Sequence, residues 1–244
     1  MRRRTAPLAP ALVPAPSAEV DSLRRGLELL RELTPARSGI SLHALAARMA
    51  LPRATLGRLA ATLAEFGLVR TIPGTDRIEP DIGCLALGHA LRSGMAALRA
   101  ARPLIEELAA SRHAQVRVCV RDRLQLLVLE SAGAVEAGVL APITGCAAGH
   151  AILWATESPL QGALLQRIRE ETPGALGQIY RSFQQLEESG VCTIEEPLST
   201  AAPIVIPEEN MVLAIAANAR LTDELREIAA RIESATLVPP GQHD

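Results

Sequence analysis

The apolar positions between Ser41 and Thr71 follow a helical period in two short runs separated by a break. In each run they recur at i, i+3, i+4 and i+7, which predicts two amphipathic helices. The Ser41 hydroxyl suits an N-cap, and Pro52, after the break at 50–51, suits the first helical position because it has no N–H to leave unpaired. The apolar residues are Leu42, Leu45, Ala46 and Met49 in the first run, and Leu56, Leu59, Ala60 and Leu63 in the second.

The opposite face of the second helix is small, polar and cationic. At about 100° per residue, Ala54, Arg58 and Ala61 point furthest from the apolar face. Thr55, Gly57 and Thr62 flank them, and Arg53 stands at the helix start. Small residues permit close approach to a major groove, hydroxyls reach phosphates, and arginine can bind guanine O6 and N7. The alternative is an ordinary antiparallel helix pair with a solvated face.

A hairpin is predicted after this pair. Gly67 suits a helix C-cap, and the segments 68–72 and 77–79 flank a turn at 73–76 that contains Pro and Gly. With a preceding helix at 19–34, whose inner face is predicted to be Val20, Leu23, Leu27 and Leu30, residues 19–80 form a winged helix-turn-helix. The predicted DNA-binding residues are Ser41, Arg53, Thr55, Gly57, Arg58, Thr62, Arg70 and Arg77.

The period changes further along the chain. A linker helix is predicted over 81–94 and a longer helix over 95–111, which Pro103 either splits or restarts. Strands mixed with helices without strict alternation predict an α+β domain over 95–238 with a mainly antiparallel sheet. The predicted strands are 115–120, 124–130, 135–142, 202–206 and 211–217, and the predicted helices are 146–156, 159–170, 176–189 and 221–235. The last helix has Leu221, Leu225, Ile228 and Ile232 on its inner face.

Composition and charge narrow the function. Only 2% of the 244 residues are aromatic, which argues against the stacking platforms of single-stranded nucleic-acid binders. Residues 1–94 carry 13 arginines against 8 acidic residues, whereas residues 95–244 carry 12 against 19. A basic amino-terminal part on an acidic remainder fits a nucleic-acid module joined to a different domain.

The cysteines and the amino terminus suggest a cytoplasmic protein. The four cysteines lie dozens of residues apart without metal-ligand spacing, so we expect reduced thiols and no metal site. Four prolines within residues 7–16 are incompatible with a helical signal segment, and no apolar run reaches transmembrane length. Residues 1–18 are therefore predicted to be a disordered tail.

Seven segments in order resemble the IclR-type bacterial transcription regulators, and the resemblance covers about residues 20–236. They are SLRRGLELLREL at 22–33, LPRATLGRLAATLAEFGLVRTIPGTDRI at 51–78, ARPLIEELA at 101–109, GCAAGHAIL at 145–153, LEESGV at 186–191, AAPIVI at 201–206 and LAIAANARLTDELREIAARI at 213–232. Arg53, Thr55 and Arg58 match the recognition-helix residues of that family by position.

The resemblance implies an amino-terminal winged helix-turn-helix that binds double-stranded DNA and a GAF-like α/β sensor domain. It implies a homodimer or homotetramer, modulated by a small organic-acid-like effector and without a cofactor. Two recognition helices of a dimer would enter major grooves about 34 Å apart on a pseudo-palindromic operator. Repression is the more usual outcome in the family.

The effector site is expected at the start of the 146–156 helix, where free N–H groups favour an anion. The predicted effector-binding residues are Gly145, Cys146, Ala147, Ala148, Cys192, Glu195 and Ala201. Glu196 either lines the same pocket or lies in a solvated turn.

The sequence departs from the family at two places. Gly57 replaces a bulky polar residue. Residues 195–200 run directly into 201–203, which shortens a loop that walls the pocket in relatives.

Two further hypotheses remain open. The carboxy-terminal domain could serve only oligomerisation, in which case the regulator would be independent of a ligand. Alternatively, Cys146 and His150, four residues apart on a predicted helix, could act as thiol nucleophile and base. The alternative interpretation is that Cys146 is a half-buried cysteine and His150 a surface histidine, neither with a catalytic role. We expect no enzymatic activity.

Overall fold

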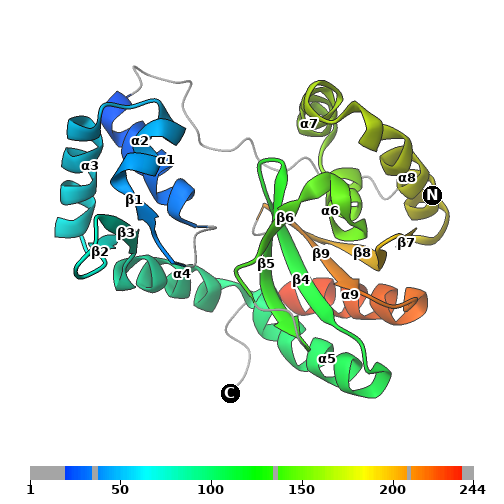
Figure 1. Cartoon of the computed structure of the whole chain (residues 1–244). Coiled ribbons are helices and arrows are strands. Elements are labelled where there is room, and N and C mark those ends of the chain that lie inside the picture. The colour runs from blue at the N-terminus through cyan, green and yellow to red at the C-terminus, as the bar shows by residue number, and fades with distance from the viewer. Residues whose placement is uncertain (1–19, 35–37, 134–136, 208–209, 238–244) are drawn as a thin grey trace. The chain divides into compact units, whose positions relative to one another are not determined.

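The computed structural model describes residues 20–34, 38–133, 137–207 and 210–237, and they divide into two compact units at Gly94/Met95 (Figure 1). The predicted disordered tail at 1–18 lies outside the described residues. In the described part of the chain, no helix is both long and apolar enough to cross a membrane.

The amino-terminal unit is a winged helix-turn-helix, as predicted. Its elements are α1 (Asp21–Leu33), β1 (Ile40–Ser41), α2 (Leu42–Met49), α3 (Arg53–Glu65), β2 (Val69–Thr71), β3 (Arg77–Pro80) and α4 (Ile82–Gly94). The three strands form an antiparallel sheet in the order β1-β3-β2, so the predicted hairpin is present with β1 added at its edge. Leu29 and Leu33 of α1, Leu45 of α2 and Leu56 of α3 are completely buried in its core.

Local sequence explains how α2 and α3 begin and end. The Ser41 hydroxyl accepts a hydrogen bond from the Ala44 N–H at 3.2 Å, which confirms the predicted N-cap. Pro52 is the extended residue before α3 rather than its first helical residue, which corrects its predicted place by one position. At the other end, Gly67 adopts a φ of +67°, and the N–H groups of Gly67 and Leu68 donate to helix carbonyls at 2.9 Å.

The predicted inner face of α1 is wrong. Leu23 and Leu27 are 61% and 53% exposed, and Val20 is exposed as well, whereas Leu29 and Leu33 point into the core. Leu30 alone of the predicted face packs partly against it. Leucines occur at helical spacing on two sides of this helix, so periodicity identifies the helix but cannot choose the side that meets α2 and α3.

The carboxy-terminal unit is an α/β domain built on one six-stranded antiparallel sheet. Its strand order is β6-β5-β4-β9-β8-β7. The strands are β4 (Val116–Asp122), β5 (Gln125–Ala132), β6 (Leu140–Pro142), β7 (Cys192–Glu195), β8 (Leu198–Ile206) and β9 (Met211–Ala217). The helices are α5 (Ala96–Arg112), α6 (Ala147–Ala155), α7 (Ser158–Glu171), α8 (Leu176–Ser189) and α9 (Thr222–Thr236), with short 3-10 turns η1 (Ile143–Gly145) and η2 (Pro173–Ala175).

Helices cover both faces of this sheet (Figure 1). On one face α5 and α9 pack, and the predicted inner residues of α9, Leu221, Leu225, Ile228 and Ile232, are all buried there. On the other face α6 packs, with α7 and α8 beside it. Pro103 lies inside an uninterrupted α5, so it neither splits nor restarts that helix.

Two strands differ from prediction. β7 was not predicted, yet it pairs with the start of β8, Cys192 opposite Ala201 and Glu195 opposite Leu198. The segment interpreted as a shortened loop is therefore a tight hairpin turn followed by strand. β6 is shorter than the predicted strand at 135–142, and residues 134–136 of that segment lie outside the described residues.

Candidate nucleic-acid interface and ligand cleft

The outward face of α3 is as the helical period predicts. Arg53, Ala54, Arg58, Ala61 and Thr62 are exposed, while Thr55 and Gly57 are half-buried at its margin. Among the described residues, no hydrogen bond or ion pair holds the guanidinium of Arg53 or Arg58. The Thr62 hydroxyl, by contrast, donates to the Arg58 carbonyl at 3.1 Å, so its donor is used within the helix. The free cations on this face are therefore the two arginines.

The arginines of the wing are engaged with the protein itself. Arg70 is exposed, and its Nε donates to Oε1 of Glu79 across the hairpin at 2.9 Å. Arg77 is half-buried and donates to the carbonyls of Ser38 at 3.0 Å and Gly39 at 2.6 Å, which fastens β3 to the chain before β1. An exposed ion pair of the Arg70 kind contributes at most about 1 kcal/mol, so that guanidinium can exchange its partner for a phosphate more readily than Arg77.

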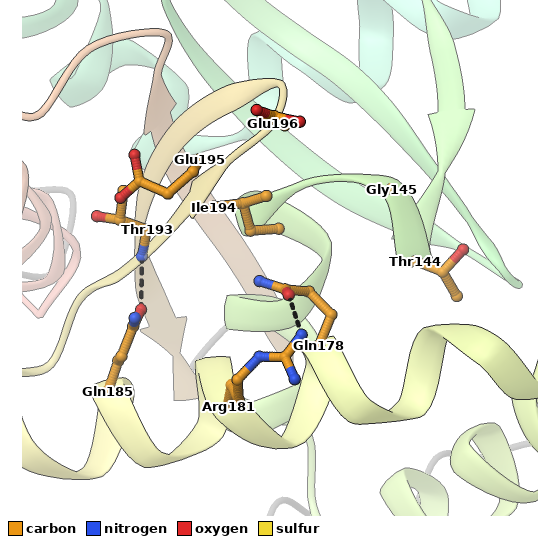
Figure 2. A pocket seen from close by; sticks show the side chains of 9 residues that line it. All are labelled: Thr144, Gly145, Gln178, Arg181, Gln185, Thr193, Ile194, Glu195 and Glu196. Carbon is orange, nitrogen blue, oxygen red and sulfur yellow. Dashed lines mark hydrogen bonds between the residues drawn. The ribbon is translucent and has the colours of Figure 1, made fainter.

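The carboxy-terminal unit contains a cleft of about 550 Å³ between η1, α8 and β7 (Figure 2). It is lined by Thr144, Gly145, Gln178, Arg181, Gln185, Thr193, Ile194, Glu195 and Glu196. Of the predicted effector-binding residues, Gly145 and Glu195 line it, and so does Glu196. Cys146, Ala147, Ala148, Cys192 and Ala201 do not: four of them are buried in the core between the sheet and α6, and Cys146 is half-buried against that core.

Polar side chains dominate the cleft. Gln178, Arg181 and Gln185 follow one another along α8, and Ile194 is the one apolar side chain among the lining residues. The Gln185 side chain accepts a hydrogen bond from the Thr193 N–H at 2.8 Å, which fixes α8 to β7. Sequence reasoning missed the three α8 residues because a polar stripe on an amphipathic helix faces solvent by default.

Glu195 and Arg181 have partners that leave part of their charge available. Glu195 forms an exposed ion pair with Arg220 at 2.5 Å. The Arg181 guanidinium donates to the neutral Gln178 amide oxygen at 2.5 Å, so no described carboxylate neutralises it. The cleft therefore has one uncompensated cation, Arg181, on the side of α8, and the two carboxylates of Glu195 and Glu196 on the side of the hairpin.

His150 is completely buried, which corrects the expectation of a surface histidine. Its Nε2 lies 3.2 Å from the Thr144 carbonyl and its Nδ1 lies 2.8 Å from the Ser182 hydroxyl. Because a carbonyl only accepts, this network assigns the proton to Nε2 and makes Nδ1 the acceptor of the Ser182 O–H. Burial lowers the pKa of His150, opposed by the Thr144 carbonyl. The neutral ring thus ties η1 to α8 beneath the cleft.

The thiols are not arranged for nucleophilic chemistry. Burial raises the pKa of Cys146, and burial raises those of Cys119 and Cys192 to about 12. A nucleophilic cysteine needs a lowered pKa and a nearby base, whereas both ring nitrogens of His150 are occupied by Thr144 and Ser182. Among the described residues, no group of three or more His, Cys, Asp or Glu side chains is placed to hold a metal ion.

A cationic helix exposed beside a winged hairpin, joined in one chain to an α/β unit with a polar cleft, defines a DNA-binding transcription regulator. Comparison with known proteins supports this class. Residues 22–73 match the IclR helix-turn-helix domain. The HTH-type transcriptional regulator TsaQ1/TsaQ2 of Comamonas testosteroni is 26% identical over 194 residues, which span 73% of this chain and 69% of that protein.

Solved structures agree over nearly the whole chain. An IclR family transcriptional regulator from Brucella abortus is 28% identical, with a TM-score of 0.82 over 96% of this chain and 98% of its own. An IclR homolog from Microbacterium hydrocarbonoxydans, complexed with 4-hydroxybenzoate, has the same fold at 20% identity, with a TM-score of 0.68 over 88% of this chain and 98% of its own. These similarities in sequence and fold together support the assignment of the chain to the IclR-type transcriptional regulators.

Proposed function

We propose that the protein binds a pseudo-palindromic operator as a homodimer, with α3 of each copy in a major groove. In this proposal residues 19–80 bind DNA, α4 within 81–94 links the units, and residues 95–238 bind an effector and oligomerise. The observation that carries it is the outward face of α3, where small residues surround Arg53 and Arg58. Arginine bound bidentately to guanine is the commonest specific contact in the major groove.

Exposed apolar side chains on two helices support the homodimer. None of the 13 residues of α4 is buried, although this helix is apolar on most of its circumference. Helices of that composition are normally covered, and exposed apolar patches mark interaction surfaces. A second copy of the chain is the partner that a two-fold operator requires. The exposed apolar residues are Val20, Leu23 and Leu27 at α1, and Ile82, Leu85, Leu87 and Leu91 on α4.

The cleft beside α8 supports an effector that modulates DNA binding. Its size suits a small molecule, and the uncompensated Arg181 suits a carboxylate. The 4-hydroxybenzoate complex of the Microbacterium relative makes an organic acid a reasonable class of ligand to test first. Binding changes operator affinity only to the extent that the effector prefers one conformation. We propose repression as the outcome, in the cytoplasm where the operator lies, and no enzymatic activity.

Operator binding is tested by removing one arginine from α3. Genomic footprinting identifies the bound sites, and affinity for one of them is then measured for the wild type, Arg58→Ala and Arg167→Ala. Loss of a base contact should weaken specific binding by about 1–3 kcal/mol, or roughly 5- to 150-fold. Arg167 is an exposed arginine of α7, so its substitution removes the same charge and should change affinity little. Equal losses in the two variants would reject base recognition by α3.

Effector binding is tested by thermal shift with a panel of carboxylates that includes 4-hydroxybenzoate. A ligand at 100 times its Kd should stabilise the protein by about 2.7 kcal/mol. Arg181→Gln should abolish that shift, whereas Arg169→Gln on the neighbouring α7 should retain it. Operator binding without stabilisation by any carboxylate would favour the ligand-independent regulator instead.

A further inference from the structure

The beginning of α4 is hydrogen-bonded to Gly67 and Leu68, the two residues that follow the C-cap of α3. The N–H of Asp81 donates to the Leu68 carbonyl at 3.0 Å, and the N–H of Gly83 donates to the Gly67 carbonyl at 2.9 Å. The Cys84 thiol also donates to the Leu68 carbonyl, at 3.2 Å. Both carbonyls after the helix therefore have partners from the start of α4.

The same two residues are bonded on their other side to α3 itself. The Gly67 N–H donates to the Ala64 carbonyl and the Leu68 N–H to the Leu63 carbonyl, both at 2.9 Å. Each residue thus donates to the helix behind it and accepts from the helix that follows the wing. No peptide group of residues 67 and 68 is left without a hydrogen bond that would otherwise let the two helices rotate independently. A displacement of α4 is therefore transmitted to α3.

Gly83 permits this contact because it has no side chain. A Cβ at this position would lie 2.5 Å from the Gly67 oxygen and 3.0 Å from the Gly67 carbonyl carbon. Both atoms belong to the backbone, so they cannot move away by a rotamer change as the end of a flexible side chain could. Any larger residue must push the first turn of α4 away from α3.

Beyond its first turn, α4 contributes no buried side chain to the described part of its unit. None of its residues is buried, and Leu85, Leu87 and Leu91 are each more than 60% exposed. The hydrogen bonds of Asp81, Gly83 and Cys84 therefore fix the beginning of α4 against the residues that follow α3.

We propose that Gly83 and Cys84 are positioning residues that join α4 and the recognition helix α3 into one rigid body. This inference rests on the proposed function, in which two α3 helices must meet two half-sites at once. Movement of α4 is then transmitted to α3 through residues 67–68. The contact between these residues and the start of α4, here called the junction, fixes the separation of the two recognition helices in the dimer. Contacts of one α3 with its own half-site do not depend on the junction.

The experiment compares Gly83→Ala with Gly88→Ala, whose added Cβ meets nothing within 4 Å on the same helix. Affinity is measured for duplex DNA with both half-sites and for duplex DNA with one. For Gly83→Ala we expect at least about a tenfold loss on the complete operator and less than about a twofold change on the single half-site, since only the complete operator requires a fixed spacing. Gly88→Ala should change neither affinity.

Two outcomes for Gly83→Ala would overturn the proposal. One is unchanged affinity for the complete operator; the other is an equal loss on both DNAs, which a general loss of the folded helix-turn-helix would cause. Failure of the wild-type protein to bind either DNA would instead overturn the proposed function, and this role of Gly83 with it.

Cys84 provides a second and milder test. Cys84→Ser keeps a donor for the Leu68 carbonyl and should retain affinity for the complete operator. Cys84→Ala leaves that carbonyl with the Asp81 N–H alone and should lose about threefold or more on the complete operator only, consistent with one hydrogen bond. Equal behaviour of the two variants on the complete operator would contradict the contact.

Discussion

Gly149→Ala is the most informative perturbation of the carboxy-terminal unit. Gly149 lies in the first turn of α6, against the backbone of Ile143 in η1. A Cβ there would stand 1.9 Å from the Ile143 carbonyl oxygen and 2.7 Å from the carbonyl carbon. Since η1 also carries Thr144 and Gly145 of the cleft, the displacement would move one wall of the ligand site.

The magnitude follows from two opposing effects. Overpacking in a close-packed interior typically costs 1–3 kcal/mol and occasionally more, and overlap of a methyl group with backbone atoms belongs at the upper end. Alanine gains about 1 kcal/mol over glycine in a helix interior. The net loss is therefore about 2 kcal/mol or more, which lowers the melting temperature by roughly 4–8 °C for a domain of this size.

Gly162→Ala provides the matched control. Gly162 lies inside α7, and an added Cβ meets nothing within 4 Å. The same substitution there should raise the melting temperature by about 2–4 °C, because only the helix propensity changes. Calorimetric melting of both variants measures the contrast. A Gly149→Ala protein as stable as Gly162→Ala would refute the close approach of α6 to η1.

Two further predictions concern buried groups. Because the pKa of His150 is lowered on folding, the unfolded state binds more protons, so stability is complete above about pH 6.5 and falls on acidification below it. His150→Gln should remove the contribution of this group to the pH dependence of the free energy of unfolding, which is at most about 1.4 kcal/mol per pH unit. His89→Gln on α4 should not remove it. Urea unfolding between pH 7.5 and 5.0 measures the difference. With pKa values of about 12, Cys119 and Cys192 should resist Ellman's reagent at pH 8 until the protein is unfolded, and rapid modification of either in the native protein would contradict their burial.

Much of the architecture is predictable from local patterns. The cap at Ser41, the two apolar stripes, the Pro-Gly turn and the inner face of α9 each depend on residues within one or two turns of each other. These features specify a winged helix-turn-helix and an antiparallel sheet before any long-range contact is known. Arg58 is located the same way, because the buried stripe of α3 determines which side remains outside.

The features that sequence reasoning missed depend on tertiary packing. Helix α1 offers leucines on two sides, and only the position of α2 and α3 decides that Leu29 is buried and Leu27 is not. β7 has four residues and exists through its pairing with β8. Arg181 faces a cleft only because that hairpin stands opposite α8, and His150 is buried because Ser182 and Thr144 satisfy both of its nitrogens.

Methylation interference on a bound operator tests most directly whether α3 reads the major groove. Guanine N7 faces the major groove, so its methylation blocks an arginine that binds O6 and N7. We predict interference at guanines in two half-sites about 34 Å apart, and its loss in Arg58→Ala at the guanine that this residue contacts. Operator binding that tolerates N7 methylation throughout both half-sites would contradict the account.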